Sequence, residues 1–300
     1  MGKFMHLFNR RVTKAQATSG QQYQVNRTGY DIKPSSIPVS WGVETPMYWF
    51  ADNPFLSHFM NAFSGILPQG EHFMISSVRA VREQVIGLDK SLTPDISGFI
   101  GQEAHHAKMH QSFNKLLAER GLPIHRLEQL MDAYIRFLNL LSEKERMAVT
   151  GATEHFTALF GKIVLNAPEI VQQTHPSMRE VVVWHAIEEL EHKAVAYDVY
   201  QALDGSYWRR IYGVLLATAL ISSAVIYGQV IFLWADKSIG NLSSSMKGLW
   251  WMFGVGNTAG YFRKALPDYL AFFRPGFHPL QDDDIALIQQ WKSQFMPQAV

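Results

Sequence analysis

The stretch His185-Ala186-Ile187-Glu188-Glu189-Leu190-Glu191-His192 decides the fold, because it gathers histidines and carboxylates within a short piece of helix. With about 3.6 residues per turn, one helix face carries His185, Glu188, Glu189 and His192, while Glu191 points away. Apolar residues flank the stretch at 181–184 and 194–196. Burying several ionisable groups without a compensating cation is costly. The stretch therefore predicts one helix of a buried metal site.

The other ligands of such a site are present elsewhere in the chain. Residues three apart on a helix project in the same direction, so a Glu-x-x-His pair can bring a carboxylate and an imidazole to one pair of ions. The chain contains two such pairs, and each is preceded by a separate predicted helix that carries a glutamate. This order is the signature of the di-iron carboxylate four-helix bundle. The predicted ligands are Glu71, Glu103, His106, Glu154, Glu189 and His192.

Several residues near the predicted site also have ordinary structural explanations. Glu71 can be a first-turn acid that interacts with the helix dipole. His106 and His110 are one turn apart; the three-residue spacing favours His106 as the ligand and leaves His110 outside it or in a channel. Glu154 stands among apolar and small residues, so a surface role fits it poorly. Arg82 is expected to neutralise a nearby carboxylate.

Two histidines and two glycines lie close to the predicted ligands in the sequence. His105 and His155 point away from the ligand face, so they are discounted as ligands. Gly151 and Gly161 lie near the face of the helix that carries Glu154. These small residues are expected to leave room for a ligand.

The periodicity of the chain predicts an all-α fold, a ferritin-like four-helix bundle with extra helices. Glycine and proline signals delimit the expected helices at 54–65, 71–86, 93–120, 123–166 (one kinked or two consecutive) and 176–204. The predicted division is an irregular N-terminal arm at 1–50, a metal-binding bundle at 51–205, hydrophobic membrane-associated helices at 206–275 and a polar, solvated tail at 276–300.

The composition excludes several classes of function. The chain has 300 residues, enough for a substantial core, and no cysteine, so disulfides, thiolate catalysis and iron–sulfur clusters are ruled out. Its formal net charge is +1 and it has no basic run with interleaved aromatics, which argues against a nucleic-acid partner.

Residues 211–235 carry no charge, and this length suffices to cross a bilayer. Aromatic and charged residues flank the stretch at 207–210 and 236–237, as is typical at membrane interfaces. A buried central helix of a soluble bundle is the alternative. The next apolar stretch, 249–253, is short and followed by glycines, which favours an in-plane segment. Arg209 and Arg210 favour placing the helical body that precedes them on the cytoplasmic side of the bacterial inner membrane.

Three segments resemble a bacterial family known as predicted metal-dependent hydrolases: 67–74 around Glu71, 101–106 around Glu103, and 185–193. The motif order of that family resembles the ferritin-like di-iron superfamily. The spacing His185-x3-Glu189-x2-His192 is also similar to the di-iron arylamine N-oxygenases. This second resemblance implies that His185 enters the metal shell from one turn earlier.

The main hypothesis is a membrane-associated, non-haem di-iron oxidoreductase that uses O2 to oxidise a hydrophobic substrate, such as a lipid or fatty-acyl chain. The expected cofactors are two iron ions, with manganese as the alternative. An electron donor and the membrane are the other expected partners, and a homodimer is left open. The expected catalytic groups are Glu103, Glu154, His185 and Glu189. The residues expected to surround the metal ligands are Glu188, His110 and Arg82. Glu188 is also considered as an alternative ligand.

Two other functions are weighed against this hypothesis. The first is a metal-dependent hydrolase, in which the ions lower the pKa of bound water to give a hydroxide nucleophile. The second is a metal-handling protein without enzymatic activity.

Overall fold

The computed structural model describes residues 32–38, 41–42 and 44–295. Within these residues the fold is all-α, and the only β pairing is an isolated bridge between Phe50 and Thr174. The predicted fold class is confirmed. The helices are α1 Pro54–Leu88, α2 Thr93–Glu119, α3 Ile124–Leu138, α4 Glu143–Asn166, α5 Pro168–Gln173, α6 Pro176–His192, α7 Val195–Leu203, α8 Tyr207–Ala235, α9 Leu242–Phe253, α10 Tyr261–Ala271 and α11 Ile285–Phe295.

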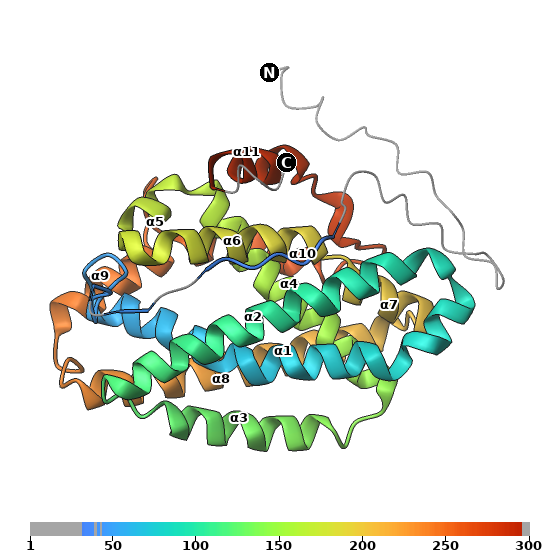
Figure 1. Cartoon of the computed structure of the whole chain (residues 1–300), viewed down its shortest axis with the longest axis horizontal. Helices are drawn as coiled ribbons and strands as arrows, with labels where there is room; N and C mark the ends of the chain where they lie inside the picture. The colour runs from blue at the N-terminus through green and yellow to red at the C-terminus, as the bar shows by residue number, and fades with distance from the viewer. Residues whose placement is uncertain (1–31, 39–40, 43, 296–300) are drawn as a thin grey trace, which may run out of the picture.

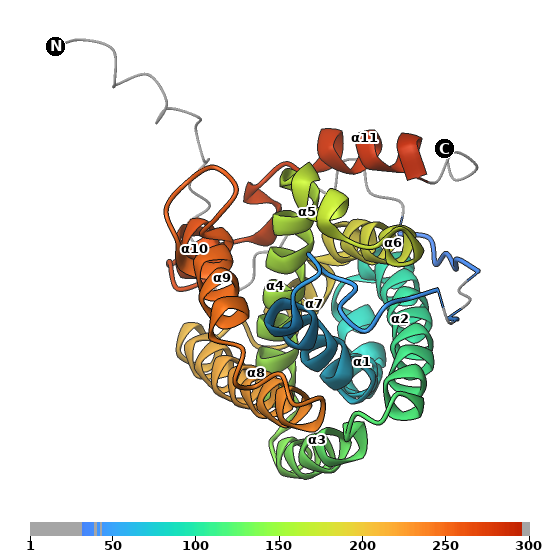
Figure 2. The same cartoon turned by 90° about the vertical axis from the view of Figure 1, so that its left-hand side faces the viewer.

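Four long helices, α1, α2, α4 and α6, form the centre of the molecule (Figures 1 and 2). Helix α1 packs along α2, and α4 packs along α6. Further contacts join α1 to α4 and α2 to α6, so the four helices close around a common interior. The remaining helices surround this bundle: α3 and α8 lie on one side of it and α11 on the other (Figure 1).

Helix α1 runs unbroken from Pro54 to Leu88 and contains Pro68, so the predicted break at 65–68 is wrong. A proline inside a helix removes one backbone donor. Here the adjacent turn gains a partner from outside, because the Asn114 amide of α2 donates to the carbonyl of Gly65 at 3.3 Å. Packing against α2 and α8 also holds the helix together. Glu71 therefore lies in the middle of α1, which excludes its explanation as a first-turn acid.

The helix that carries the opening motif ends at His192, and α7 begins at Val195. The expected single helix at 176–204 is therefore wrong. The bend lets α7 pack closely against α4, where a Cβ on Gly151 would lie 3.6 Å from the Cα of Tyr197. Of the two arrangements left open for 123–166, the chain adopts two helices, because Ser142 begins α4 with a capping box.

The described part of the N-terminal arm is irregular, and residues 1–31 lie outside the described residues. Its segment 32–38, here called the strap, runs over α2 and α6. A Cβ on Gly98 would lie 2.3 Å from the carbonyl oxygen of Ile32, and one on Gly101 would lie 2.3 Å from Pro34. Glycine is thus needed at both positions for the strap to reach α2. His105 fastens it, with Nδ1 2.6 Å from the carbonyl oxygen of Ser35.

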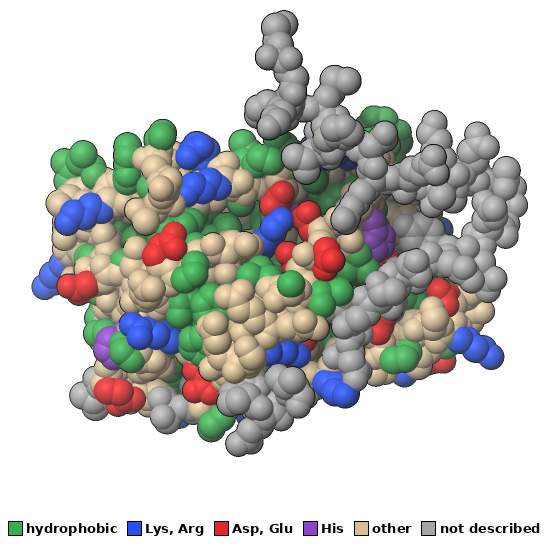
Figure 3. Space-filling model, turned by 90° about the horizontal axis from the view of Figure 1, so that it is seen from above, with side chains coloured by type: hydrophobic (Ala, Val, Ile, Leu, Met, Phe, Trp, Pro, Cys, Tyr) green, Lys and Arg blue, Asp and Glu red, His purple; other side chains and the backbone are tan. Residues whose placement is uncertain are grey.

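The C-terminal helix α11 packs on α6, so the expected solvated tail at 276–300 is wrong for this helix. Ile288 and Trp291 are buried, and the Trp291 indole donates to the carbonyl of Leu165 at 2.9 Å. The opposite side of α11 faces solvent. Acidic and basic side chains are mixed with hydrophobic ones on the face seen from above (Figure 3).

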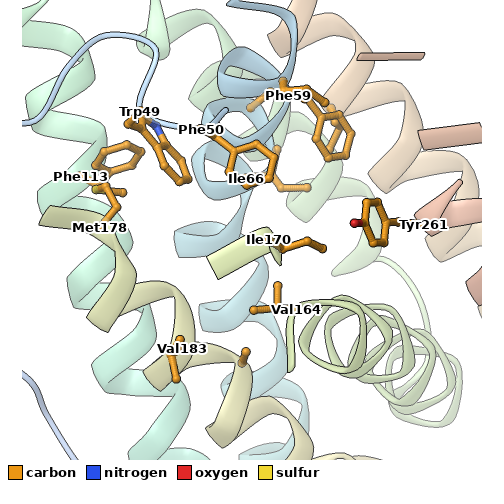
Figure 4. Packing of buried hydrophobic residues seen from close by; sticks show 14 of the residues in the cluster. Trp49, Phe50, Phe59, Ile66, Phe113, Val164, Ile170, Met178, Val183 and Tyr261 are labelled. Carbon is orange, nitrogen blue, oxygen red and sulfur yellow. The ribbon is translucent and has the colours of Figure 1, made fainter. Parts of the chain in front are cut away.

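Two apolar clusters fill the bundle, one toward each end. The first joins the N-terminal half of α1 to α5, α6 and α9, and includes Trp49, Phe50 and Phe113 (Figure 4). The second joins the C-terminal half of α1 to α4 and α7. In α1, Ile66 belongs to the first cluster and Phe73 to the second, with buried Glu71 between them. A polar layer therefore separates the two apolar clusters.

Candidate metal centre

The polar layer brings together all seven predicted metal ligands. Each of the four central helices supplies at least one of them, from a position between the apolar clusters. Six are almost completely buried, and His185 is slightly more exposed. The seven residues are Glu71 from α1, Glu103 and His106 from α2, Glu154 from α4, and His185, Glu189 and His192 from α6.

His192 is at the centre of one group. Its Nε2 lies 3.1 Å from Oε1 of Glu103, 3.3 Å from Oε2 of Glu154 and 3.4 Å from Oε2 of Glu189. These four residues each offer one ligand atom, and the four atoms lie within 4.8 Å of one another. Three carboxylates and one imidazole from three helices thus form a compact set of oxygen and nitrogen donors.

A second group lies beside the first and shares residues with it. Glu103 also joins Glu71 and His106, and Glu189 also joins His106 and His185, each set within 4.8 Å. The Nδ1 of His106 is 3.5 Å from Oε1 of Glu189, and Nε2 of His185 is 2.9 Å from the same oxygen. Glu103 and Glu189 belong to both groups and therefore join them.

The buried donors of this layer fit a metal. Both carboxylate oxygens of Glu71, Glu103 and Glu154 are buried without a hydrogen bond among the described residues, as is Nε2 of His192. Buried polar atoms are normally hydrogen-bonded, and several exceptions in one place call for an explanation. Bound cations supply one, since carboxylate and imidazole are the ligands that iron, manganese and zinc accept.

The electrostatics of the metal-free cluster point the same way. Burial, followed by the charges of the neighbouring glutamates, raises the pKa of Glu71 well above its ordinary value. Burial also raises the pKa of Glu154. Burial opposes protonation of His106, but Glu188 and Glu189 outweigh it and raise its pKa to about 9. The cluster thus holds protons that a metal ion would displace.

Glu188 lies on the outer side of His106, so the structure separates it from Glu189. Its Oε2 is 3.0 Å from Nε2 of His106, the ring nitrogen opposite the one that faces Glu189. Its Oε1 accepts hydrogen bonds from the Trp184 indole (3.1 Å) and from the backbone of Ser35 in the strap (3.2 Å). Glu188 is therefore placed to orient the imidazole rather than to ligate an ion.

His192 has an outer partner that the sequence did not indicate. Its Nδ1 lies 3.0 Å from Oε1 of Gln102, and the Gln102 amide donates to Glu191 at 2.9 Å. The other oxygen of Glu191 pairs with Lys292 of α11. Gln102 stands next to Glu103 in the motif, but only the packing of α2 against α6 shows that it reaches His192.

Of the other two expected outer residues, one lies at the cluster and the other does not. His110 has Nε2 3.7 Å from Glu71, while its Nδ1 bonds to Ser64 at 2.7 Å. It also forms a ligand-capable set with Glu71 and His185, so it stands closer to the ligand cluster than expected. Arg82 lies three turns beyond Glu71, where its guanidinium is 3.8 Å from the Glu83 carboxylate and 3.5 Å from Ser97. It therefore neutralises a neighbouring carboxylate as expected, but it does not reach the cluster.

The expected room beside the ligands is present at Gly161, which borders a cavity together with Glu189, and both glycines of α4 also serve helix packing. A Cβ on Gly161 would lie 2.8 Å from the carbonyl oxygen of Ala186 and 3.3 Å from the Cβ of Glu189. The approach of α7 at Gly151 is less close, because an added Cβ would lie 3.6 Å from the Cα of Tyr197. Gly161 thus sets the distance between α4 and α6 beside the ligands.

An apolar cavity opens beside the cluster. His110, His185 and Glu189 lie on its wall, and the rest of the wall is mostly aromatic and aliphatic. Trp41 and Trp49, from the segment that precedes α1, form part of its wall. The arrangement places a hydrophobic compartment in contact with the metal-ligating side chains. The sequence did not single out these tryptophans, because they lie outside any metal motif.

A comparison with protein families identifies the family of this chain. A family model described as "Predicted metal-dependent hydrolase" matches residues 33–283. The chain belongs to this family. The match confirms the resemblance to this family that the three sequence segments indicated. Searches of curated proteins and of solved structures each found no match.

The match to the predicted metal-dependent hydrolase family spans the whole site. It begins in the strap and extends past α10, so it contains the four central helices, both Glu-x-x-His pairs and α8. The family description and the buried groups of histidine and glutamate together support a metal-dependent enzyme.

Proposed function

We propose that this member of the family is an oxidoreductase with two metal ions in the polar layer and a hydrophobic substrate in the adjoining cavity. The observation that carries the proposal is the pair of overlapping ligand groups, joined through Glu103 and Glu189. Four helices contribute, in the order expected for a ferritin-like di-iron bundle. Catalytic roles for Glu103, Glu154, His185 and Glu189 follow from their place in these groups.

The donor set supports redox chemistry. It contains oxygen and nitrogen only, which suits iron or manganese. When bound, a pair of iron ions supplies the redox chemistry needed to use O2. Burial of the glutamates and histidines keeps bulk water from the ions, and His185 adds a nitrogen donor on the side that faces the cavity. Such a reaction also requires a reduced electron-transfer partner.

The cavity supports the choice of substrate. Its wall is lined by side chains such as Phe63, Phe113 and Met178, with few polar groups apart from the ligand cluster. An apolar pocket with a few convergent polar groups is the usual form of a small-molecule site. An acyl chain or another hydrophobic molecule fits this environment, with the bond to be oxidised held next to His185 and Glu189.

Hydrolysis is the second candidate, and the family description favours it over oxidation. The same two ions would lower the pKa of bound water and provide a hydroxide nucleophile. The apolar cavity would then hold the acyl part of an ester or amide. Against this candidate, the order of the ligands along the four helices is that of the di-iron carboxylate bundle.

One experiment separates the candidates. The full chain is loaded anaerobically with Fe(II), Mn(II) or Zn(II), and metal content, O2 consumption with a reductant, and ester cleavage are measured. Oxidation predicts two irons per chain and O2 consumption that is lost in Glu189→Ala but kept in Glu180→Ala, an exposed position of α6. Ester cleavage by the Zn(II) form without any O2 response of the Fe(II) form would establish hydrolysis instead.

A further inference from the structure

We propose that the outer face of α8, α9 and α10 lies in the plane of an anionic phospholipid bilayer, and that an apolar passage leads from this face to the metal centre. The passage deepens the proposed function, since it rests on a hydrophobic substrate; the attachment to lipid does not. These three helices cover one side of the bundle (Figure 2).

Helix α8 is long and apolar enough to cross a membrane, the only such helix within the described part of the chain. However, it lies against the bundle along its length. A Cβ on Gly213 would come 2.6 Å from the backbone of Ala148 in α4, and one on Gly228 would come 2.9 Å from Ala62 in α1. A spanning orientation would carry α1 and α4, with their charged residues, into the hydrocarbon. An in-plane orientation avoids that cost.

The opposite side of α8 exposes large hydrophobic residues. Trp208 is 77% exposed, Ile226 60% and Trp234 72%, and Leu215 and Val230 also face outward. The exposed apolar surface continues in α9, as the side chains of Leu242, Met246, Leu249, Trp250 and Phe253. In the most apolar 18-residue segment of α8, only 33% is buried in the bundle. A contiguous exposed apolar surface of this kind marks an interaction site.

The charges beside this surface identify the partner as an anionic membrane. From 207 to 271, the span of the three helices, the chain has six basic residues and two acids, Asp236 and Asp268, and Asp268 pairs with Lys162 at 2.8 Å. The Asp236 carboxylate is already engaged, 2.6 Å from His58. The exposed basic residues of this region are Lys237, Lys247, Arg263 and Lys264. Basic residues at the edge of an apolar face are attracted to anionic lipid headgroups. The face seen in Figure 3, by contrast, mixes acidic and basic residues.

A passage connects this side of the molecule to the metal centre. A second apolar cavity lies between α1, α3, α4 and α8, and Leu220 and Ile221 of α8 form part of its wall. It shares Phe63, Leu67 and Thr157 with the cavity that contacts the ligand cluster. These three side chains therefore form the boundary between the two cavities. A hydrophobic molecule taken from the bilayer beside α8 would reach the ions without crossing water.

The attachment is tested by flotation of the purified full chain with vesicles of phosphatidylcholine alone or with added phosphatidylglycerol. Binding is expected only to the anionic vesicles and should weaken with salt. The double variant Lys247→Glu/Lys264→Glu should bind about tenfold more weakly. Lys108→Glu, an exposed position of α2, is the matched control and should bind like the parent. Equal binding to both vesicle types, or none, would overturn the proposal.

The orientation is tested by depth-dependent quenching, which the absence of cysteine makes straightforward. A fluorophore is attached to Tyr212→Cys, Ile226→Cys or Leu249→Cys and quenched with lipids brominated at shallow or deep positions. In-plane docking predicts the same shallow depth for all three. A spanning α8 would separate the first two by about 21 Å along the bilayer normal, and that result would refute the orientation.

The passage is tested with Ile221→Trp, which fills the second cavity from α8, and with Ile226→Trp on the exposed side of the same helix as the control. Metal-free protein on vesicles is titrated with a fluorescent fatty acid. Uptake should fall about tenfold in Ile221→Trp only. Equal uptake by both variants would disprove the passage. Because no metal or turnover is involved, this outcome is independent of the reaction that the ions perform.

Discussion

The Nε2 of His106 lies 3.0 Å from Glu188, and the Nδ1 of the same ring faces Glu189 at 3.5 Å. The imidazole thus stands between an outer carboxylate and one that belongs to the ligand cluster. Two adjacent glutamates of one helix therefore have different environments, and the difference can be measured.

Glu188→Gln is expected to weaken metal binding by about tenfold, because an outer carboxylate fixes the orientation and basicity of a ligating histidine. The number of ions bound at saturation should stay the same. Competitive titration with a chelating dye measures both quantities. Glu180→Gln on the exposed side of α6 is the control. A lower stoichiometry at saturation would show that Glu188 is itself a ligand.

Lys292→Ala should lower the free energy of unfolding by about 2 kcal/mol, because it leaves the buried carboxylate of Glu191 without its cation. The double variant Lys292→Ala/Glu191→Gln should recover most of this loss, since a neutral amide needs no counter-ion. Urea denaturation of the three variants and the parent measures the effect. Additive losses in the double variant would show that the ion pair is unimportant.

The ligands could be predicted because their spacing is a property of single helices. Because Glu103 and His106 are three residues apart, they lie on the same side of their helix, and this does not depend on the rest of the fold. The roles of Glu188 and Gln102 could not be predicted in this way. Both depend on the position of α2 relative to α6, and that of Glu188 also depends on contacts with the strap, which comes from far away in the sequence.

The errors in the predicted helices have a similar origin. Pro68 is a local signal for a helix end, but contacts with α2 and α8 outweigh it. Helix α6 ends after His192 although the local sequence allows it to continue, and α7 then packs against α4. The tail was expected to be solvated from its three aspartates, whereas Trp291 buries α11 on α6. Local patterns indicate the elements, and tertiary contacts set their ends.

Metal binding should stabilise the fold strongly, and Glu154→Gln should reverse the order of stabilities. In the metal-free protein, burial raises the pKa of Glu154, so a neutral glutamine is tolerated and the variant should melt no lower than the parent. With Mn(II), the parent gains stability by mass action and the variant gains much less. Thermal melts with Mn(II) and with a chelator measure both. Equal gains would exclude Glu154 as a ligand.

Gly161→Ala should destabilise the protein by about 1–3 kcal/mol, since the new methyl group would meet the Ala186 carbonyl at 2.8 Å. Metal affinity should fall as well, because α4 and α6 must separate beside Glu189. Gly87→Ala in α1 is the matched control: nothing lies within 4 Å of its added Cβ, so it should be neutral or stabilising. Denaturation and metal titration of both variants test the prediction.

His155 should make the metal-free protein less stable in mild acid. The ring packs against Phe272 and Phe277, with centroids 4.8 and 5.4 Å away, and burial lowers its pKa to about 4 from an ordinary value of 6.5. The unfolded chain therefore binds a proton between these values when the folded protein does not. The stability that the neutral His155 ring contributes is fully present above pH 6.5. It is lost as the pH falls toward 4, by at most about 3 kcal/mol.

His155→Leu isolates this contribution, because leucine fills the aromatic site without titrating. Between pH 6.5 and 4, the free energy of unfolding should fall less steeply with decreasing pH in the variant than in the parent. The difference should be about 1.4 kcal/mol per pH unit, the effect of one titrating group, because the other titrating groups are unchanged. Urea denaturation at several pH values gives the slopes. If His155→Leu and the parent have the same slope, the ring is protonated in the folded state and opens to solvent, which its position between two phenylalanines argues against.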